Sequence, residues 1–138
     1  VARLLKPGGR ACIQSIVIDD ALFERYVQGT DFIQQYIFPG GCLPSPSRIR
    51  AAAQAAGLRV VEEFAFGYDY AETLRRWHQR FIQQRAQVQA QGFDERFQRT
   101  WEFYLAYCEA GFDARSIDVV QYTLIKDGER PASSGTLL

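Results

Sequence analysis

The sequence contains no methionine, one histidine and three cysteines, and its 16 basic side chains are balanced by 16 acidic ones. Histidine and cysteine are the usual ligands of zinc. A single histidine, with cysteines at positions 12, 42 and 108 that have no paired spacing, predicts neither a metal site nor a disulfide framework. Because nucleic-acid-binding domains usually carry a basic excess, the zero net charge argues against a nucleic-acid partner. The cysteine usage favours a reducing, cytoplasmic setting.

Long apolar runs and glycine-rich phosphate loops are also missing. No stretch approaches the roughly 18 apolar residues of a membrane-spanning helix, and no signal peptide is recognisable. Gly8-Gly9 and Gly40-Gly41 do not stand between a strand and a helix with dinucleotide-binding spacing, so we interpret them as turn glycines. Since the chain starts at Val1 in what reads as the end of a helix, we expect a piece of a longer protein.

What the sequence does contain is apolar and aromatic: 47% of its 138 residues are hydrophobic and 14% are aromatic. The segment Arg10–Ile18 is apolar on both faces except at Gln14 and Ser15. This pattern predicts a strand covered by helices on both sides, within a mostly parallel sheet of an α/β domain. Ligands of such sheets bind beyond the carboxyl ends of the strands, which directs attention to Gln14, Ser15 and Asp19-Asp20. The default role of the two aspartates is to cap the next helix, ahead of a role in catalysis.

The rest of the chain alternates helical and extended patterns. We predict a second strand that crosses over, right-handed, onto a parallel neighbour, a hairpin of two long helices, and a third strand. The predicted segments are helix end 1–6, helix from 20, short helical piece 31–38, helix 48–56, strand 58–66, helix from 68 to near Gly92, helix from 94, strand 117–126 and a flexible tail 127–138.

Several strings of residues resemble one family. LKPGGRACIQSIVIDD, DFIQQYIFPGGCLPS, FAFGYDYAETLRRWHQRF, GFDERFQRTWEFYLAYCEAGF and IDVVQYTL are similar to the carboxyl-terminal half of the cyclopropane-fatty-acyl-phospholipid synthases, which include the mycolic acid cyclopropane synthases. The resemblance implies that residues 1–126 are the carboxyl-terminal part of a Rossmann-like class I methyltransferase domain, with about three strands and a helical insertion at about 68–113. It also implies a peripheral enzyme at the inner face of the membrane.

The activity that this resemblance implies is transfer of a methyl group from S-adenosylmethionine to a cis double bond of a phospholipid acyl chain, followed by proton loss and ring closure. The cofactor would be bound mainly by the amino-terminal half, which we expect to lie outside this sequence. In the family a bicarbonate ion is thought to take the proton, held by a glutamate, a histidine, an isoleucine backbone and a tyrosine. By position, the isoleucine is Ile16 and the tyrosine is Tyr104, and the glutamate belongs to the missing half.

The histidine position falls on Gln14, which departs from the family pattern. A neutral amide can bond to bicarbonate but cannot carry a positive charge. The product could therefore be a cyclopropane, a methyl-branched chain or a methylene chain. Within a buried strand an unpartnered amide would cost about 1–3 kcal/mol, so we expect Gln14 to have a partner, either a ligand or a neighbouring group.

We also expect five side chains to line an acyl-chain pocket: Tyr36, Phe38, Tyr68, Tyr70 and Cys108. Each has a purely structural alternative. The aromatic residues could fill the core, and Cys108 could be a small buried hydrophobic residue.

The sequence also suggests two partners, a membrane surface and a second copy of the same chain. Positive charge on the helical insertion could meet anionic lipid headgroups during a transient visit to the membrane surface. Its arginines are Arg75, Arg76, Arg80, Arg85, Arg96 and Arg99. An unpaired sheet edge could mediate a homodimer. The chain alone should be inactive, and the rival interpretation is a non-catalytic domain that binds acyl chains or proteins.

Overall fold

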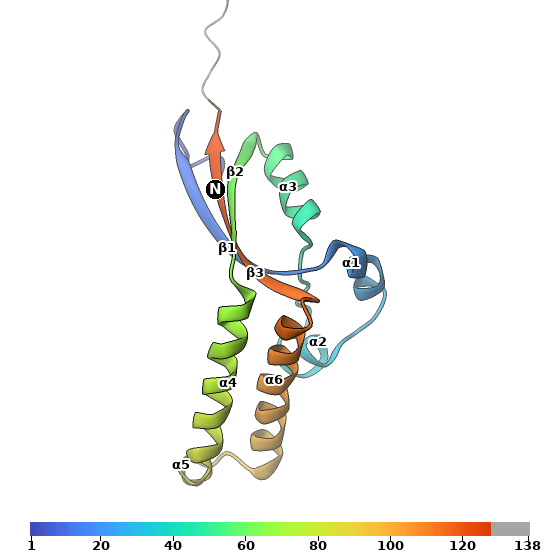
Figure 1. Ribbon diagram of the computed structural model, residues 1–138, viewed down its shortest axis with the longest axis vertical. Coiled ribbons are helices and arrows are strands. Elements are labelled where there is room, and N and C mark those ends of the chain that lie inside the picture. Colours follow the sequence, from blue (N-terminus) through green and yellow to red (C-terminus); the bar gives the residue numbers. More distant parts are fainter. Residues whose placement is uncertain (128–138) are drawn as a thin grey trace, which may run out of the picture.

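The computed structural model describes residues 1–127, and the prediction of a flexible tail falls almost wholly on residues 128–138, outside the described part. Figure 1 shows a twisted sheet with one helix beside it and a helical hairpin extending from one end. In chain order the elements are β1 (Arg10–Ile18), α1 (Asp20–Val27), α2 (Phe32–Tyr36), α3 (Pro46–Ala55), β2 (Leu58–Ala65), α4 (Gly67–Gln83), α5 (Arg85–Ala90), α6 (Glu95–Asp113) and β3 (Ile117–Lys126).

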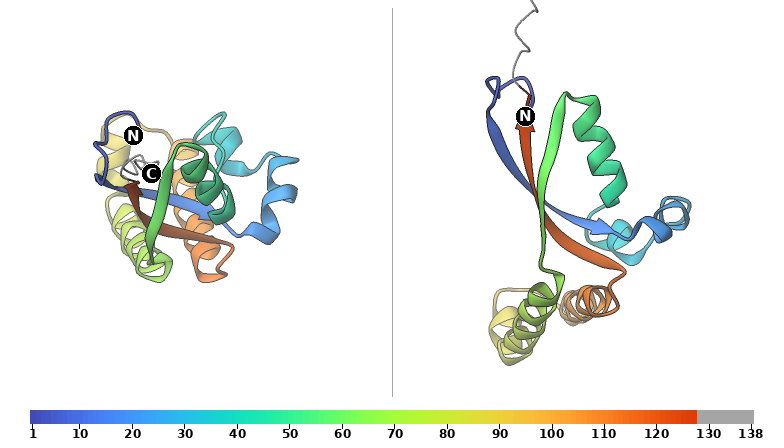
Figure 2. Two further views of the ribbon diagram at one scale, coloured as in Figure 1. Left: turned by 90° about the horizontal axis from the view of Figure 1, so that it is seen from above. Right: turned by 45° about the horizontal axis from the view of Figure 1, so that its top comes forward.

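The sheet has the strand order β1-β3-β2, and β3 runs antiparallel to both of its neighbours. The prediction that the second strand would pair with the first as a parallel neighbour is therefore wrong. β3 returns from the helical hairpin in the opposite direction and occupies the place between them (Figure 2). A strand's own residue pattern does not reveal this insertion.

β1 is an edge strand, and its burial is uneven. Only Val17 and Ile18 are buried, whereas Cys12, Ile13 and Gln14 are exposed. The expectation of a strand covered on both faces is wrong for this first half. Helices cover only the end of β1, and its outer edge has no strand partner among residues 1–127.

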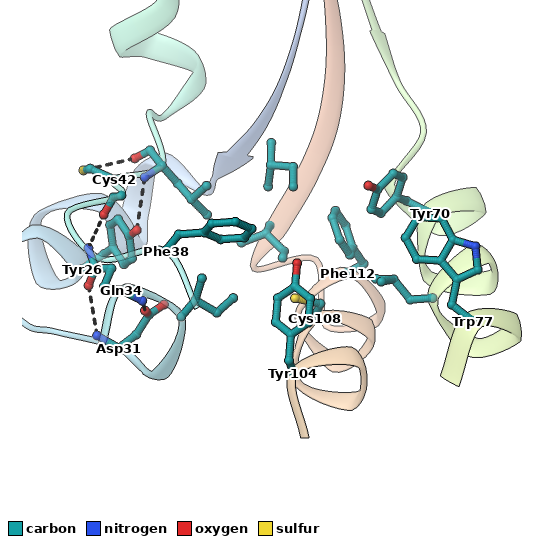
Figure 3. A pocket seen from close by; sticks show the side chains of 16 residues that line it. Tyr26, Asp31, Gln34, Phe38, Cys42, Tyr70, Trp77, Tyr104, Cys108 and Phe112 are labelled. Carbon is teal, nitrogen blue, oxygen red and sulfur yellow. Dashed lines mark hydrogen bonds between the residues drawn. The ribbon is translucent and has the colours of Figure 1, made fainter. Parts of the chain in front are cut away.

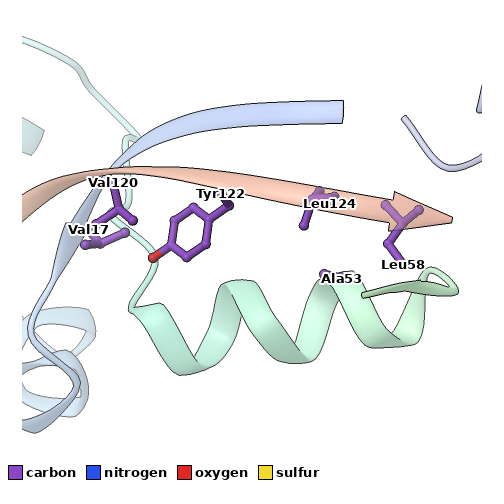
Figure 4. Packing of buried hydrophobic residues seen from close by; sticks show 6 residues of the cluster. All are labelled: Val17, Ala53, Leu58, Val120, Tyr122 and Leu124. Carbon is purple, nitrogen blue, oxygen red and sulfur yellow. The ribbon is translucent and has the colours of Figure 1, made fainter. Parts of the chain in front are cut away.

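One face of the sheet is closed by α3. The contact consists of short aliphatic side chains around one tyrosine (Figure 4): Val17, Ala53, Leu58, Val120, Tyr122 and Leu124. Ser45 precedes α3 and Pro46 opens it, two residues before the predicted start at residue 48, but the Ser45 side chain makes no cap hydrogen bond. The Asp20 carboxylate does this instead, accepting from the backbone N–H of Ser47 at 3.2 Å. This negative charge at the amino terminus of α3 favours the helix.

The other face carries the predicted antiparallel hairpin of α4 and α6. Its core contains Ala71, Leu74, Leu105, Cys108, Phe112 and Val119. The first long helix was expected to continue to near Gly92, but it ends at Gln83, and the short α5 completes the turn. Arg75 of α4 reaches Glu109 and Asp113 of α6 at 3.0 and 3.2 Å, which ties the two helices together.

The start of α4 is fixed by a contact with the sheet. Asp118 of β3 accepts from the Gly67 backbone N–H at 2.8 Å. A Cβ atom at position 67 would lie 2.6 Å from the same carboxylate, so the close approach requires glycine. This contact places the carboxyl end of β2 beside the hairpin.

Residues 1–6 form turns and no helix, contrary to prediction. The Lys126 ammonium donates to the carbonyls of Ala2 and Leu5 at 3.0 and 2.9 Å, and the Gly8 N–H donates to the Lys126 carbonyl at 2.8 Å. Pro7 also disfavours helical backbone at Lys6. The segment is thus attached to the end of β3.

Candidate functional site

A cavity of about 150 Å³ lies where the carboxyl end of β1 meets the hairpin. Its walls come from α1, α2, the loop that follows α2, α4, α6 and the beginning of β3 (Figure 3). Aromatic and aliphatic side chains form most of the surface, including Ile16, Phe38, Tyr70, Trp77, Tyr104 and Phe112. The location agrees with the general expectation for ligands of α/β sheets.

Two of the three predicted catalytic residues meet in this cavity. Ile16 lies near the end of β1, and Tyr104 projects from α6 and forms a T-shaped pair with Phe38, the ring centroids 6.4 Å apart. Gln14 does not line it. Its side chain is exposed, and its carbonyl accepts a hydrogen bond from the Gln121 amide at 3.0 Å. Gln14 thus has the expected hydrogen-bond partner, which is a side chain of β3. The prediction that Gln14 is buried is wrong, because α4 and α6 do not cover that part of the sheet.

The five predicted acyl-contact residues divide into two groups. Phe38, Tyr70 and Cys108 line the cavity. Tyr36 is 57% exposed and packs on Phe32, and Tyr68 is 59% exposed and accepts a hydrogen bond from Arg115 at 2.9 Å. The aromatic pattern alone does not distinguish the two groups.

The Tyr104 hydroxyl and the Cys108 thiol, both on the α6 side of the cavity, are neutral at physiological pH. Removal from water raises the pKa of Tyr104 to about 12, and the neighbouring Cys108 adds to this shift. Removal from water likewise raises the pKa of Cys108 to about 11. Tyr104 is therefore a hydrogen-bonding phenol rather than a phenolate base, and Cys108 is not a reactive thiolate.

Several lining residues were not identified from the sequence as site residues. Leu74 and Trp77 belong to the apolar stripe of α4, which predicted packing but no role in a cavity. Gln34 and Tyr26 also line it. The sequence contains a local signal for Gln34, because Asp31 and Gln34 form the capping box of α2. Tyr26 has no such signal, because its hydrogen bond to Leu43 joins residues 17 positions apart.

Other site types receive no support in the described part. Within residues 1–127 no group of three or more metal-ligating side chains comes together. None of the described helices is both long and apolar enough to cross a bilayer.

Comparisons with known proteins agree with the geometry. Residues 1–122 match the family model described as mycolic acid cyclopropane synthetase. The chain belongs to this family. It is 47% identical over 129 residues to tuberculostearic acid methyltransferase UfaA1 of Mycobacterium tuberculosis, covering 91% of this chain and 30% of that protein. It is 40% identical over 92 residues to the cyclopropane-fatty-acyl-phospholipid synthase of Escherichia coli K12, covering 65% of this chain and 23% of that protein.

Solved structures give the same result for the fold. The cyclopropane synthase MmaA2 from Mycobacterium tuberculosis superposes with a TM-score of 0.79 at 23% identity, covering 91% of this chain and 47% of that one. The mycolic acid cyclopropane synthase CmaA1, complexed with SAH and CTAB, also gives a TM-score of 0.79, at 29% identity and coverages of 90% and 46%. The predicted α/β fold of a Rossmann-like class I methyltransferase is confirmed. The chain spans less than a third of these curated relatives and about half of these solved chains.

Proposed function

We propose that this chain forms the acyl-chain-binding part of an S-adenosylmethionine-dependent methyltransferase that adds a methylene or methyl group at the cis double bond of phospholipid acyl chains. The observation that carries the proposal is the aromatic-walled cavity at the end of β1, in a chain of the cyclopropane synthetase family. Apolar clefts with a few placed polar groups are the usual form of sites for hydrocarbon ligands.

The cavity fits a hydrocarbon chain better than it fits the cofactor. Asp31 is the only lining residue with a charged side chain, and its carboxylate already accepts from the Gln34 backbone N–H at 2.8 Å. S-adenosylmethionine, which would supply the methyl group, has a charged sulfonium, an amino acid group and a polar nucleoside. The described residues do not match those groups, so we assign the cofactor to other residues of the complete enzyme.

The residues of the cavity can hold the chain and exclude water. Addition of a methyl group to a double bond develops positive charge on the chain, and the ring faces of Tyr70, Trp77 and Tyr104 favour a nearby cation. The neutral Tyr104 hydroxyl can orient a proton acceptor such as bicarbonate next to Ile16. Gln14 lies two residues before Ile16 and hence on the same face of β1. We therefore propose that Gln14 makes a secondary contact with the bound ligand where that face is open.

We also propose that the complete enzyme works at the inner face of the membrane. Arg75 and Arg76 pair with Glu72, and Arg85 pairs with Glu102. Within residues 1–127 no carboxylate lies within ion-pair distance of Arg80, Arg96 or Arg99, which leaves these three to meet anionic headgroups. A homodimer through the outer edge of β1 stays a prediction, and sedimentation would measure it.

The test is a lipid analysis of cells that express the complete enzyme carrying these residues and are fed labelled methionine. Labelled cyclopropane or methyl-branched chains should appear, and Tyr104→Phe should reduce them strongly while Tyr107→Phe, on the same helix, does not. Tyr70→Phe tests whether another tyrosine hydroxyl of the cavity contributes to product formation. Gln14→Ala tests the secondary contact of Gln14 with the ligand. Binding of acyl chains without any labelled product would support the non-catalytic alternative instead.

A further inference from the structure

The loop that follows α2 forms one wall of the cavity, and it contains a turn that is closed by its own hydrogen bond. Pro39 and Gly40 are the central residues of this turn, with Gly40 at φ +79°. The Gly41 N–H donates to the Phe38 carbonyl at 2.9 Å. Proline followed by a glycine with positive φ is the preferred sequence of a type II turn. The turn therefore moves as a unit with Phe38, whose ring faces Tyr104.

Two side chains from other elements hold this turn in place. The Gln34 side-chain amide of α2 donates to the Gly41 carbonyl at 2.9 Å. The Tyr26 hydroxyl of α1 accepts from the Leu43 N–H at 3.1 Å. Figure 3 shows both bonds on the same side of the cavity as Phe38. Gln34, Tyr26, Phe38 and Leu43 all line the cavity, so the clamp and the wall that it holds face the same space.

The orientation of the Gln34 amide is fixed at both ends. Its oxygen accepts from the Asp31 N–H at 3.0 Å, which leaves its nitrogen for Gly41. The amide thus links the first turn of α2 to the wall of the cavity. Loss of the nitrogen donor alone would release the loop without removing the helix cap.

We propose that Gln34 and Tyr26 are positioning residues that set the width of the acyl-chain cavity by holding residues 38–43 against it, so that the site prefers an unbranched chain over a branched one. The inference rests on the proposed function. If the clamp is released, Phe38 can move outward, and the cavity then accepts a bulkier chain.

The clamp itself is tested by amide hydrogen exchange, which needs neither cofactor nor substrate. Tyr26→Phe removes the acceptor of the Leu43 N–H, so exchange at Leu43 should become roughly fivefold faster, as expected for one hydrogen bond. Gln34→Glu keeps an oxygen for the capping box but loses the donor to Gly41, and it should also speed exchange at Leu43. The controls are Tyr107→Phe and Gln35→Glu, both at exposed positions. Unchanged exchange in both clamp variants would overturn the proposal.

The effect on the ligand is read by fluorescence in a Trp101→Phe background, which leaves Trp77 in the cavity as the sole tryptophan. Phosphatidylglycerol vesicles with a 9,10-dibromostearoyl chain should quench Trp77. Oleoyl phosphatidylglycerol should compete more strongly than its 10-methylstearoyl counterpart. Tyr26→Phe and Gln34→Glu should reduce that preference roughly fivefold, and the two controls should retain it.

The two readouts separate the possible failures. If dibromostearoyl lipid does not quench Trp77 in any variant, the proposed function and the acyl role of the clamp are both overturned, even where Leu43 exchange shows that the clamp exists. If quenching occurs but the preference is unchanged in both clamp variants, only the clamp's role in selectivity is overturned.

Discussion

The two faces of the sheet are built differently. Against α3, the side chains of Val17, Tyr122 and Leu124 are at most 3% exposed, and the contact contains small alanine side chains. Against the hairpin, a cavity of about 150 Å³ opens between α6 and the loop after α2, and the Phe38 ring at its wall is 58% exposed. Both faces are apolar, so composition does not separate them.

The two faces differ in the size of the side chains that pack against the sheet. The short side chains of α3 allow a close approach to β2 and β3, and the side chains between them are buried and closely packed. The large rings on α4, α6 and the loop cannot interdigitate so closely, and they surround a space instead. The α3 face therefore serves the fold alone, whereas the hairpin face combines a buried core with a cavity that is available to a ligand.

The largest effect should come from the α3 face. Leu124→Ala should lower the free energy of unfolding by about 3 kcal/mol, because it removes buried methyl groups and leaves a cavity among close-packed neighbours. Ile125→Ala is the matched control, since the next residue of β3 points to the opposite face and is only partly buried; we expect about 1 kcal/mol. Urea denaturation measures both. Equal losses at the two positions would remove the proposed difference between the faces.

Alkaline pH should destabilise the hairpin face. The folded-state pKa of Cys108, about 11, lies above its ordinary value of 9.0. The neutral thiol therefore contributes stability that is fully present below pH 9 and is lost as pH rises toward 11. The loss should be about 1 kcal/mol per pH unit from this group. Cys108→Ala should make the fall in unfolding free energy between pH 9 and 11 less steep, whereas Cys12→Ala, at an exposed thiol, should not.

How much the sequence could predict depended on the range of the interaction. The helices of the hairpin follow from apolar spacing, and that spacing also put Tyr104 and Cys108 on one face of α6. The helices α4 to α6 span residues 67–113, and their assignment as a helical insertion of a methyltransferase domain stays a prediction. Capping at Asp19 is local and is confirmed by its bond to the Ala21 N–H at 2.7 Å.

The strand order and the exposure of Gln14 depended on elements far away in the chain. An apolar strand has the same pattern whether its neighbour is parallel or antiparallel, and β3, which separates β1 from β2, follows the whole hairpin in the chain. Gln14 is exposed because the hairpin of α4 and α6 extends from one end of the sheet and does not cover this part of β1 (Figure 1), which no property of residues 10–18 specifies. The clamp at Tyr26 was missed for the same reason.

Phe38→Ala tests whether the exposed wall contributes to binding rather than to folding. Because the ring is 58% exposed, the free energy of unfolding should fall by less than about 1 kcal/mol, but quenching of Trp77 by dibromostearoyl lipid should weaken severalfold. Phe64→Ala is a matched control: it is also 58% exposed, stacks on Phe66 and lies outside the cavity. If both variants weaken quenching equally, the wall has no specific role.

The smallest effect concerns a buried side-chain hydroxyl of the α3 face that lacks a partner among residues 1–127. Tyr122 is completely buried, and its hydroxyl makes no hydrogen bond to any described residue. Figure 4 shows the hydroxyl pointing toward the beginning of α3. An unsatisfied buried hydroxyl costs free energy, so Tyr122→Phe should leave the free energy of unfolding unchanged or raise it by about 0.5 kcal/mol. A loss above about 1 kcal/mol in urea denaturation would show that the hydroxyl is hydrogen-bonded in solution. The α3 face would then contain a polar contact, and the contrast with the hairpin face would be one of packing density rather than of polarity.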